Sequence, residues 1–203
     1  MIKLKICGLR RIEDISYVNE LKPDYVGFVL TKSKRQINLK ELIVLKSLLN
    51  KNILAVGVFK DNEIEDIYAA APYLDAIQLH GKEPLEYQKA VKEKTKLPII
   101  KKVDLDENES YADYLMFDNL NPGSGKTFDW NLLKGKTNYF LAGGVALENI
   151  KEAKKLHPYC LDVSSSIETN GYKDYEKMKQ FIKEARLWKD VMENTVDNMS
   201  LKH

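Results

Sequence analysis

The sequence is poor in the residues that build disulfide frameworks and metal sites. Its 203 residues include only two cysteines, Cys7 and Cys160, and three histidines. The two cysteines are far apart, and no cysteine or histidine spacing typical of zinc ligation is present. We therefore expect free thiols in a reducing cytoplasm and no bound metal.

Long apolar runs and an excess of charge of one sign are also missing. No stretch approaches the roughly 20 apolar residues that a membrane-spanning helix needs. The opening residues, MIKLKICGLR, lack the apolar run and cleavage site of a secretory signal. Lysine and arginine number 32 against 30 aspartate and glutamate residues, a balance that argues against broad nucleic-acid binding. We expect a cytoplasmic protein with no membrane or nucleic-acid partner.

What the sequence does contain is a repeated pattern of a short apolar run, a turn and an amphipathic stretch. Continuous apolar runs are typical of parallel strands that are buried on both faces. The runs cover residues 4–7, 25–30, 53–59, 75–79, 97–103, 114–118, 138–144 and 160–165. Such units predict a single α/β domain, a (β/α)8 TIM barrel over residues 1–189, with a polar tail over residues 190–203. Periodicity alone leaves an open doubly wound sheet as the alternative.

Helical periodicity is found between several of the runs. The segments with apolar residues at helical spacing are 39–49, 62–68, 147–153 and 175–188. Asn62 is predicted to cap the second of these helices, because its side chain suits that position. The connection over residues 104–113 is too short and too acidic for a full helix, so we expect a loop or a single turn there.

The segment GSGKT, residues 123–127, resembles part of a nucleotide-binding loop. The full P-loop pattern needs a glycine five positions before Gly125, where the chain has Leu120. The third glycine of a dinucleotide fingerprint is replaced by Phe128. We therefore expect this segment to be a flexible loop over a substrate and not a nucleotide site.

Polar residues follow several of the predicted strands. In a barrel of this kind the active site lies at the carboxyl ends of the strands, so these residues would converge although they are far apart in sequence. The candidate site residues are Cys7, Arg35, Gln78, His80, Asp118, Gly143, Gly144, Asp162, Ser164 and Ser165.

Two pairs among these residues predict a phosphate site. Gly143 and Gly144 allow backbone N–H groups to approach an anion closely, and Ser164 and Ser165 add hydroxyl groups. Loops after the seventh and eighth strands often bind phosphate in such barrels. A plain turn is the alternative for the glycines. We expect a small-molecule sugar phosphate as the ligand.

Three of the residues are candidates for chemistry. Cys7, as a thiolate, would act as a base, although a free cysteine is more often a small buried apolar residue. Asp118 ends an apolar run, and burial there would raise the pKa of its carboxyl so that it donates a proton near neutral pH. Arg35 has the geometry to hold a carboxylate by two parallel hydrogen bonds. A solvent-exposed strand end and a solvated basic loop are the alternatives for Asp118 and Arg35, and His80 is either an acid–base group or structural.

In order along the chain, the residues resemble those of the phosphoribosylanthranilate isomerase family of tryptophan biosynthesis. The matching motifs are KICG (5–8), VGFVL with SKR (26–30, 33–35), VGVF (56–59), QLHG (78–81), GSGKTFDW (123–130) after the Asp118 strand, LAGG (141–144) with Asn149, and DVSS (162–165) with Ile167-Glu168 and residues 171–174. The resemblance implies a compact (β/α)8 barrel with a reduced fifth helix.

The resemblance implies an aldose–ketose isomerase that uses no cofactor. The reaction would be the Amadori rearrangement of N-(5-phosphoribosyl)anthranilate to 1-(2-carboxyphenylamino)-1-deoxyribulose 5-phosphate. Asp118 would be the general acid at the furanose ring oxygen, Cys7 the general base at the neighbouring sugar carbon, and Arg35 would face the anthranilate carboxylate. The residues that match the phosphate cradle are Gly143, Gly144, Ser164 and Ser165. A monomer or a homodimer is expected.

The sequence departs from the family pattern at two positions. Pro122 stands where a glycine is common, which predicts a stiffer loop. Ser166 stands where the family usually has glycine, which predicts strain if that residue needs a positive φ.

Three alternatives remain at this point. Another phosphosugar barrel enzyme, such as the synthase that follows this step or an epimerase, would need catalytic lysine and glutamate residues or metal ligands. Activity on the related aminoaldose of histidine biosynthesis would use the same chemistry. A non-catalytic phosphate-binding barrel would leave Cys7 and Asp118 dispensable.

Overall fold

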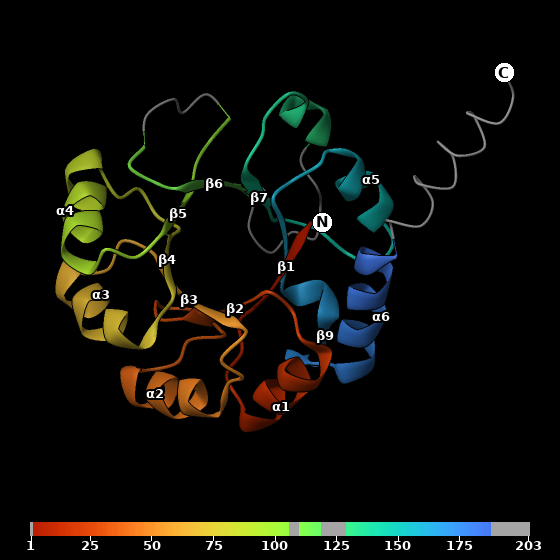
Figure 1. Ribbon diagram of the computed structural model, residues 1–203, viewed down its shortest axis with the longest axis horizontal. Helices are drawn as coiled ribbons and strands as arrows, with labels where there is room; N and C mark the ends of the chain where they lie inside the picture. Colours follow the sequence, from red (N-terminus) through yellow and green to blue (C-terminus); the bar gives the residue numbers. More distant parts are fainter. Residues whose placement is uncertain (1, 106–109, 119–128, 188–203) are drawn as a thin grey trace, which may run out of the picture.

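The eight predicted strands form a closed barrel. The structure is a computed structural model that describes residues 2–105, 110–118 and 129–187. Figure 1 shows the strands in chain order around the barrel, and every neighbouring pair is parallel. They are β1 (Lys3–Cys7), β2 (Tyr25–Val29), β3 (Leu54–Phe59), β4 (Ala76–Leu79), β5 (Ile99–Lys102), β6 (Tyr114–Phe117), β7 (Tyr139–Leu141) and β8 (Cys160–Val163). Because β8 pairs with β1, the sheet has no edge, and the open doubly wound alternative is wrong.

Helices surround the barrel unevenly (Figure 1). The α-helices are α1 (Ile12–Leu21), α2 (Leu39–Leu48), α3 (Ile64–Ala70), α4 (Leu85–Thr95), α5 (Ile150–Lys155) and α6 (Tyr175–Arg186). Short 3₁₀ turns are η1 (Ala71–Tyr73), η2 (Trp130–Leu133) and η3 (Ser165–Ile167). The described residues between β5 and β6, namely 103–105 and 110–113, contain no helix, which agrees with the expected reduced fifth helix. Residues 106–109, the 123–127 segment with Pro122, and the 190–203 segment lie outside the described residues.

The predicted helix cap at Asn62 is wrong. Glu63 is the residue before α3, and its side chain makes no capping hydrogen bond. The Asn62 amide oxygen instead accepts the Lys60 N–H at 3.0 Å, and its amide nitrogen donates to the Leu30 carbonyl at 3.2 Å. Asn62 therefore closes the turn after β3 and joins it to the loop after β2.

Side chains alternate along each strand between the barrel interior and the surrounding helices. In β1, Leu4 and Ile6 belong to the outer core, whereas Lys5 and Cys7 face inward. The inner core is a second set of buried residues: Tyr25, Val56, Ala76, Ile100, Met116, Phe140, Ala142 and Cys160. Several of these residues begin their strands, so the amino-terminal end of the barrel is closed by packing.

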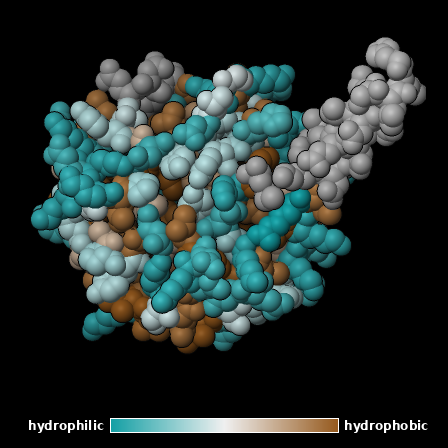
Figure 2. All heavy atoms as spheres, in the orientation of Figure 1, coloured by the Kyte–Doolittle hydropathy of each residue, from teal (hydrophilic) through white to brown (hydrophobic). Residues whose placement is uncertain are grey.

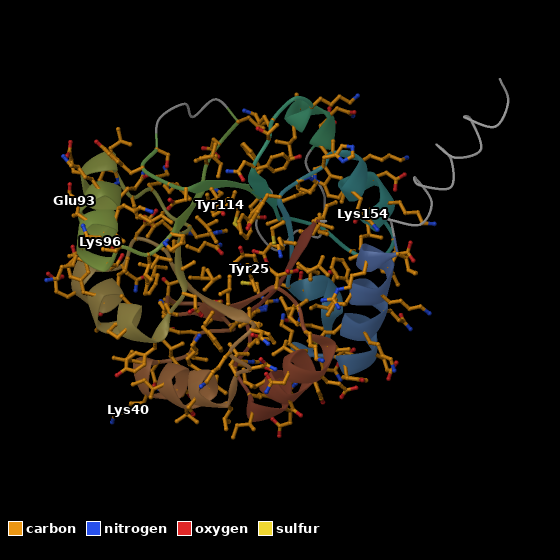
Figure 3. All side chains as sticks on the ribbon, in the orientation of Figure 1. Tyr25, Lys40, Glu93, Lys96, Tyr114 and Lys154 are labelled. Carbon is orange, nitrogen blue, oxygen red and sulfur yellow. The ribbon has the colours of Figure 1, made fainter. Side chains whose placement is uncertain are left out.

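Aromatic rings form much of this inner packing. Figure 3 shows Tyr25 and Tyr114 directed into the barrel, whereas Lys40, Glu93 and Lys96 point outward. The Phe140 ring lies edge-on to both tyrosines, with centroid distances of 5.6 Å and 5.5 Å.

On the face shown in Figure 2, hydrophilic residues predominate, and apolar atoms reach the surface at the lower edge, near α1 and α2. Helix α2 buries Leu42 and Leu45 but leaves Val44 and Leu48 exposed. No helix in the described part of the chain is long and apolar enough to cross a membrane.

Replacement of Phe140 by alanine should lower the free energy of unfolding by about 3–5 kcal/mol, because it leaves a cavity in the inner core. Urea titration followed by circular dichroism measures this as a lower midpoint with an unchanged slope. The control is Leu132→Ala, at a side chain that is 57% exposed, which should change stability by less than about 0.5 kcal/mol. A loss below about 1 kcal/mol in Phe140→Ala would contradict this account of the core.

Candidate active site

A cavity of about 420 Å³ opens at the carboxyl ends of the strands. All ten residues predicted from the sequence line it, and they come from the ends of β1, β4, β6, β7 and β8 and from the loop after β2. Parallel strands in a closed barrel bring residues that are distant in sequence to one rim. The strand-end reasoning therefore located these side chains, and their individual roles stay predictions.

Cys7 ends β1 and presents its sulfur to the cavity. Gly27 of β2 lies against it, because a Cβ added at Gly27 would be 2.6 Å from Cys7 Sγ. Burial raises the pKa of the Cys7 thiol, while the ammonium groups of Lys5 and Lys173 act to lower it, and the net direction is upward. The positive charge of Lys5 and Lys173 is therefore what favours ionisation of the Cys7 thiol.

Lys5 is the residue of the interior that the sequence analysis missed. Its side chain is fully buried and donates to Asp162 Oδ2 at 2.6 Å and to Gln78 Oε1 at 2.8 Å. Burial alone would lower the pKa of the Lys5 ammonium, but Asp162 and Cys7 raise it above its ordinary value. The sequence did contain a signal for this residue. Side chains alternate along a strand, so Lys5, two positions before an inward-facing Cys7, must face inward too.

Asp162 has one carboxylate oxygen without a hydrogen-bond partner among the described residues. Oδ2 accepts from Lys5, whereas Oδ1 is buried and has no hydrogen-bond partner. A buried polar atom without a partner is costly to the folded state. That Asp162 binds substrate stays a prediction.

A chain of polar contacts runs from Lys5 through Gln78 and His80 to Asp118. Because Gln78 Oε1 accepts from Lys5, its amide nitrogen is a donor, and that nitrogen lies 3.0 Å from His80 Nδ1. His80 Nδ1 is then the acceptor, so the proton of the neutral ring is on Nε2. His80 Nε2 lies 3.2 Å from Asp118 Oδ2. Gln78 and His80 thus orient Asp118.

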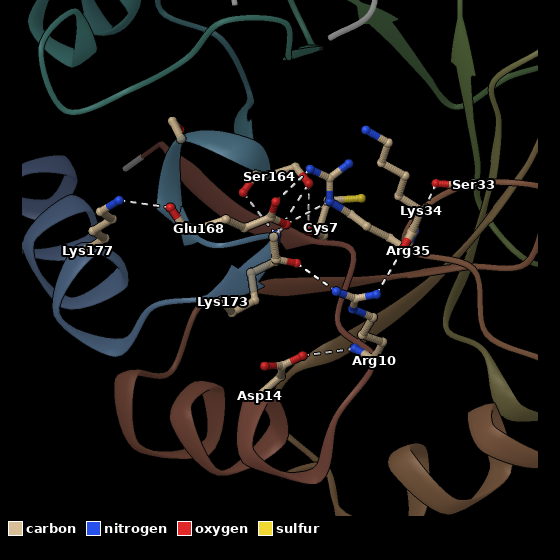
Figure 4. A network of polar contacts seen from close by, with 12 residues as sticks. Cys7, Arg10, Asp14, Ser33, Lys34, Arg35, Ser164, Glu168, Lys173 and Lys177 are labelled. Carbon is tan, nitrogen blue, oxygen red and sulfur yellow. Dashed lines mark hydrogen bonds and ion pairs between the residues drawn. The ribbon is translucent and has the colours of Figure 1, made fainter.

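Arg35 lines the cavity but is already paired with a protein carboxylate. Figure 4 shows its guanidinium against Glu168, with Nε–Oε1 and Nη2–Oε2 both at 2.7 Å. Lys173 also donates to Glu168 Oε1 at 2.7 Å. Sequence reasoning quoted Glu168 and Lys173 only as parts of motifs and assigned them no role.

The predicted phosphate cradle has the backbone that the glycines suggested. Gly143 and Gly144 have φ values of 72° and 77°, which favour glycine. Asn149 holds their loop, because its side chain accepts from the Ala146 N–H at 2.9 Å and donates to the Gly144 carbonyl at 2.8 Å. Ser164 Oγ donates to the Cys7 carbonyl at 2.9 Å, which joins the cradle to the end of β1.

Ser166 does not have the positive φ that would strain it. It lies within η3, and its hydroxyl donates to the Val145 carbonyl at 2.7 Å. Serine in place of glycine therefore adds a contact between the loops after β7 and β8, and the expected strain does not occur.

A lysine–glutamate pair does occur at the barrel rim, but outside the cavity. Lys101 and Glu83 are buried with a 3.1 Å ion pair, and Lys101 also donates to the carbonyls of Gly81 and Lys102. Neither side chain lines the cavity. This pair connects backbone segments near the rim and is not placed to act as the catalytic lysine and glutamate that the synthase alternative needs. No cluster of metal-ligating side chains is found in the described residues.

Comparison with known proteins gives one consistent result. The family model described as N-(5'phosphoribosyl)anthranilate (PRA) isomerase matches residues 4–184. The protein of that name from Thermoanaerobacter sp. (strain X514) is 46% identical over 200 residues, covering 92% of this chain and 98% of that protein. The one from Endomicrobium trichonymphae is 44% identical over 198 residues, covering 92% and 99%.

Solved structures agree with this result. The crystal structure of phosphoribosyl anthranilate isomerase from Thermotoga maritima is 36% identical, has a TM-score of 0.82, and is covered over 99% of its length by 92% of this chain. A second crystal structure is of phosphoribosyl anthranilate isomerase in complex with reduced 1-(o-carboxyphenylamino)-1-deoxyribulose 5-phosphate. It is 33% identical, has a TM-score of 0.77, and the match covers 92% of this chain and 99% of that chain. On the fold, the cavity and these similarities, the chain belongs to the N-(5'-phosphoribosyl)anthranilate isomerase family.

Proposed function

We propose that this chain isomerises N-(5-phosphoribosyl)anthranilate to 1-(2-carboxyphenylamino)-1-deoxyribulose 5-phosphate, with Asp118 as acid and Cys7 as base. The observation that carries the proposal is that both side chains line one cavity, at the ends of β6 and β1, in a member of this family. A non-catalytic barrel would not require these two groups to share a cavity.

The reaction begins with proton donation from Asp118 to the furanose ring oxygen. The carbon–oxygen bond breaks, and the ring opens to an iminium ion conjugated with the aromatic ring. The Cys7 thiolate then removes the proton from the adjacent sugar carbon, because the iminium nitrogen accepts the electron pair. The enolamine that forms tautomerises to the aminoketose, so no oxidant, reductant or metal is needed. General acid and base catalysis of this kind each contribute about 10²- to 10⁴-fold in rate.

The remaining residues of the cavity bind the ends of the substrate. Gly143, Gly144, Ser164 and Ser165 hold the phosphate, and Arg35 binds the aromatic carboxylate. Asp162, which also lines the cavity, accepts a hydrogen bond from a sugar hydroxyl. The substrate is therefore fixed at both ends with the reacting carbons between Cys7 and Asp118.

The setting proposed for this activity is the cytoplasm, with no nucleic-acid partner. The near balance of 32 basic and 30 acidic residues supports the second part. A monomer or a homodimer fits the proposal, and a relative from Thermotoga maritima that is 32% identical is described as dimeric.

The proposed activity is tested with the purified protein and freshly generated phosphoribosylanthranilate. The anthranilate-type fluorescence of the substrate should disappear as product forms. Absence of turnover by protein with a native circular dichroism spectrum would overturn the assignment. Parallel measurement with the related aminoaldose of histidine biosynthesis shows whether the site distinguishes the two.

Cys7→Ser and Asp118→Asn should each lower kcat by about 10²- to 10⁴-fold, because each removes a proton-transfer group. KM should change much less, since neither side chain is assigned to the charged ends of the substrate. The matched control is the Cys160→Ser variant, which changes the buried thiol of the inner core. Once its folding is verified, the kcat of this variant should stay within about threefold of the parent value. Normal kcat in either active-site variant would remove that residue from its role.

Lys5→Met should raise the pKa of the Cys7 thiol, because it removes a positive charge and leaves Asp162 unpaired nearby. The rate of alkylation by iodoacetamide, measured against pH with Cys160 replaced by alanine, reports this pKa. The rising limb of kcat/KM should move to higher pH by the same amount, since the thiolate is the active form.

Loss of Lys5 leaves a buried carboxylate, so folding needs its own control. The double variant Lys5→Met with Asp162→Asn removes both charges. It shows how the pKa of the Cys7 thiol depends on Lys5 when no unpaired carboxylate is left in the interior. An alkylation profile that stays in place, or moves to lower pH, in the single variant would show that Lys5 does not stabilise the thiolate.

A further inference from the structure

The Arg35 side chain follows a constrained path to Glu168. Its stem passes over Gly8, where an added Cβ would lie 2.4 Å from Arg35 Cδ, and Gly8 has a φ of 85°. Glu168 begins β9 (Glu168–Thr169), which pairs with β10 (Tyr172–Lys173) to form a small hairpin after β8. Figure 4 shows the two side chains meeting beside Cys7. The backbone on both sides thus fixes where the guanidinium lies.

The ion pair occupies only one edge of the guanidinium. Nε and one N–H of Nη2 donate to the two Glu168 oxygens, both at 2.7 Å. A guanidinium has five N–H donors, so within the described residues three are left, two on Nη1 and one on Nη2. Arg35 lines the cavity, and these three donors match the two oxygens of a second carboxylate.

Glu168 is held in turn by Lys173. The Lys173 side chain is 1% exposed and donates to Glu168 Oε1 at 2.7 Å and to the Ser164 carbonyl at 2.9 Å. Burial acts to raise the pKa of the Glu168 carboxyl, but Arg35 and Lys173 together hold it below its ordinary value. Glu168 therefore stays ionised at neutral pH, between Arg35 and Lys173.

The charges of this cluster favour an anionic substituent next to it. Arg35 and Lys173 are cations and Glu168 is the anion between them, so one positive charge is left over. Because the guanidinium is already ordered, a carboxylate that binds its outer edge does not have to immobilise a flexible side chain. Lys173 also contacts Ser164, so the same lysine supports the predicted carboxylate and phosphate ends of the cavity.

We propose that Glu168, supported by Lys173, is a positioning residue that presents the free Nη1/Nη2 edge of Arg35 to the aromatic carboxylate of the substrate. It thereby gives the site its preference for an aromatic amine that carries a carboxylate. The proposal rests on the proposed function, since it concerns the substrate of the same site.

Glu168→Gln should raise KM for phosphoribosylanthranilate by about 10- to 100-fold, the range expected when a hydrogen bond to a charged group is lost. A glutamine has one acceptor oxygen, so it cannot hold both Nε and Nη2. The change in kcat should stay below about threefold, because Cys7 and Asp118 are untouched. The matched control is Glu152→Gln, the same chemical change in an exposed pair with Lys155, which should leave both constants unchanged.

A substrate analogue separates positioning from a general structural effect. Phosphoribosylaniline lacks the carboxylate, so Glu168→Gln should change its KM by less than about twofold. In an Arg35→Met background, Glu168→Gln should add nothing to the KM for phosphoribosylanthranilate. A purely structural role of Glu168 would raise KM for both substrates in every background.

Glu168→Asp is the second variant if the glutamine variant folds poorly. It keeps the negative charge for Lys173 but shortens the side chain, and it should show the same selective rise in KM. An unchanged or lower KM for phosphoribosylanthranilate, or an equal rise for both substrates, would overturn the proposal.

Failure of the proposed function would be recognised separately. If the parent protein turned over neither substrate, the dissociation constant of reduced 1-(o-carboxyphenylamino)-1-deoxyribulose 5-phosphate would take the place of KM. A 10- to 100-fold weaker binding of this compound to Glu168→Gln, about 1.4–2.8 kcal/mol, would support the positioning role. Equal binding to both proteins would reject it.

Discussion

The ion pair between Lys5 and Asp162 lies inside the barrel, 2.6 Å apart, where β1 meets β8. Charges placed in such an interior are costly unless they are paired and hydrogen-bonded. Lys5 therefore also binds Gln78, which fixes the direction of the Gln78 amide, and that amide fixes which nitrogen of His80 carries the proton. The orientation of Asp118 thus depends on a charge at the other side of the barrel.

A second set of charges lies at the mouth of the same cavity. Glu168 separates Arg35 and Lys173, and Lys173 reaches the Ser164 carbonyl and hydroxyl at 2.9 Å and 3.3 Å. Ser164 in turn donates to the Cys7 carbonyl, so this network and the interior one meet at the end of β1. Both networks affect the Cys7 thiol, because Lys5 of the interior network and Lys173 of the network at the mouth each favour its ionised form.

The strands and the site's location could be predicted because both depend on local pattern and topology. Buried parallel strands are continuous apolar runs, and their carboxyl ends must meet. The partners of Lys5 and Arg35 could not be predicted, because Asp162 is 157 residues from Lys5 and Glu168 is 133 residues from Arg35. Helix α4 was not predicted either, since it buries only Gln88 and Val91 and has almost no apolar stripe.

The cavity is lined by residues from the first strand of the barrel and from its last two. Cys7 belongs to β1, whereas Gly143 and Gly144 follow β7 and Asp162 belongs to β8. During synthesis on the ribosome, β1 emerges early. Lys5 then has no ion-pair partner until Asp162 is made, more than a hundred residues later. Closing so long a segment of chain is entropically costly and slow. The cavity is therefore complete only once β8 has been made, because Asp162, Ser164 and Ser165 line it.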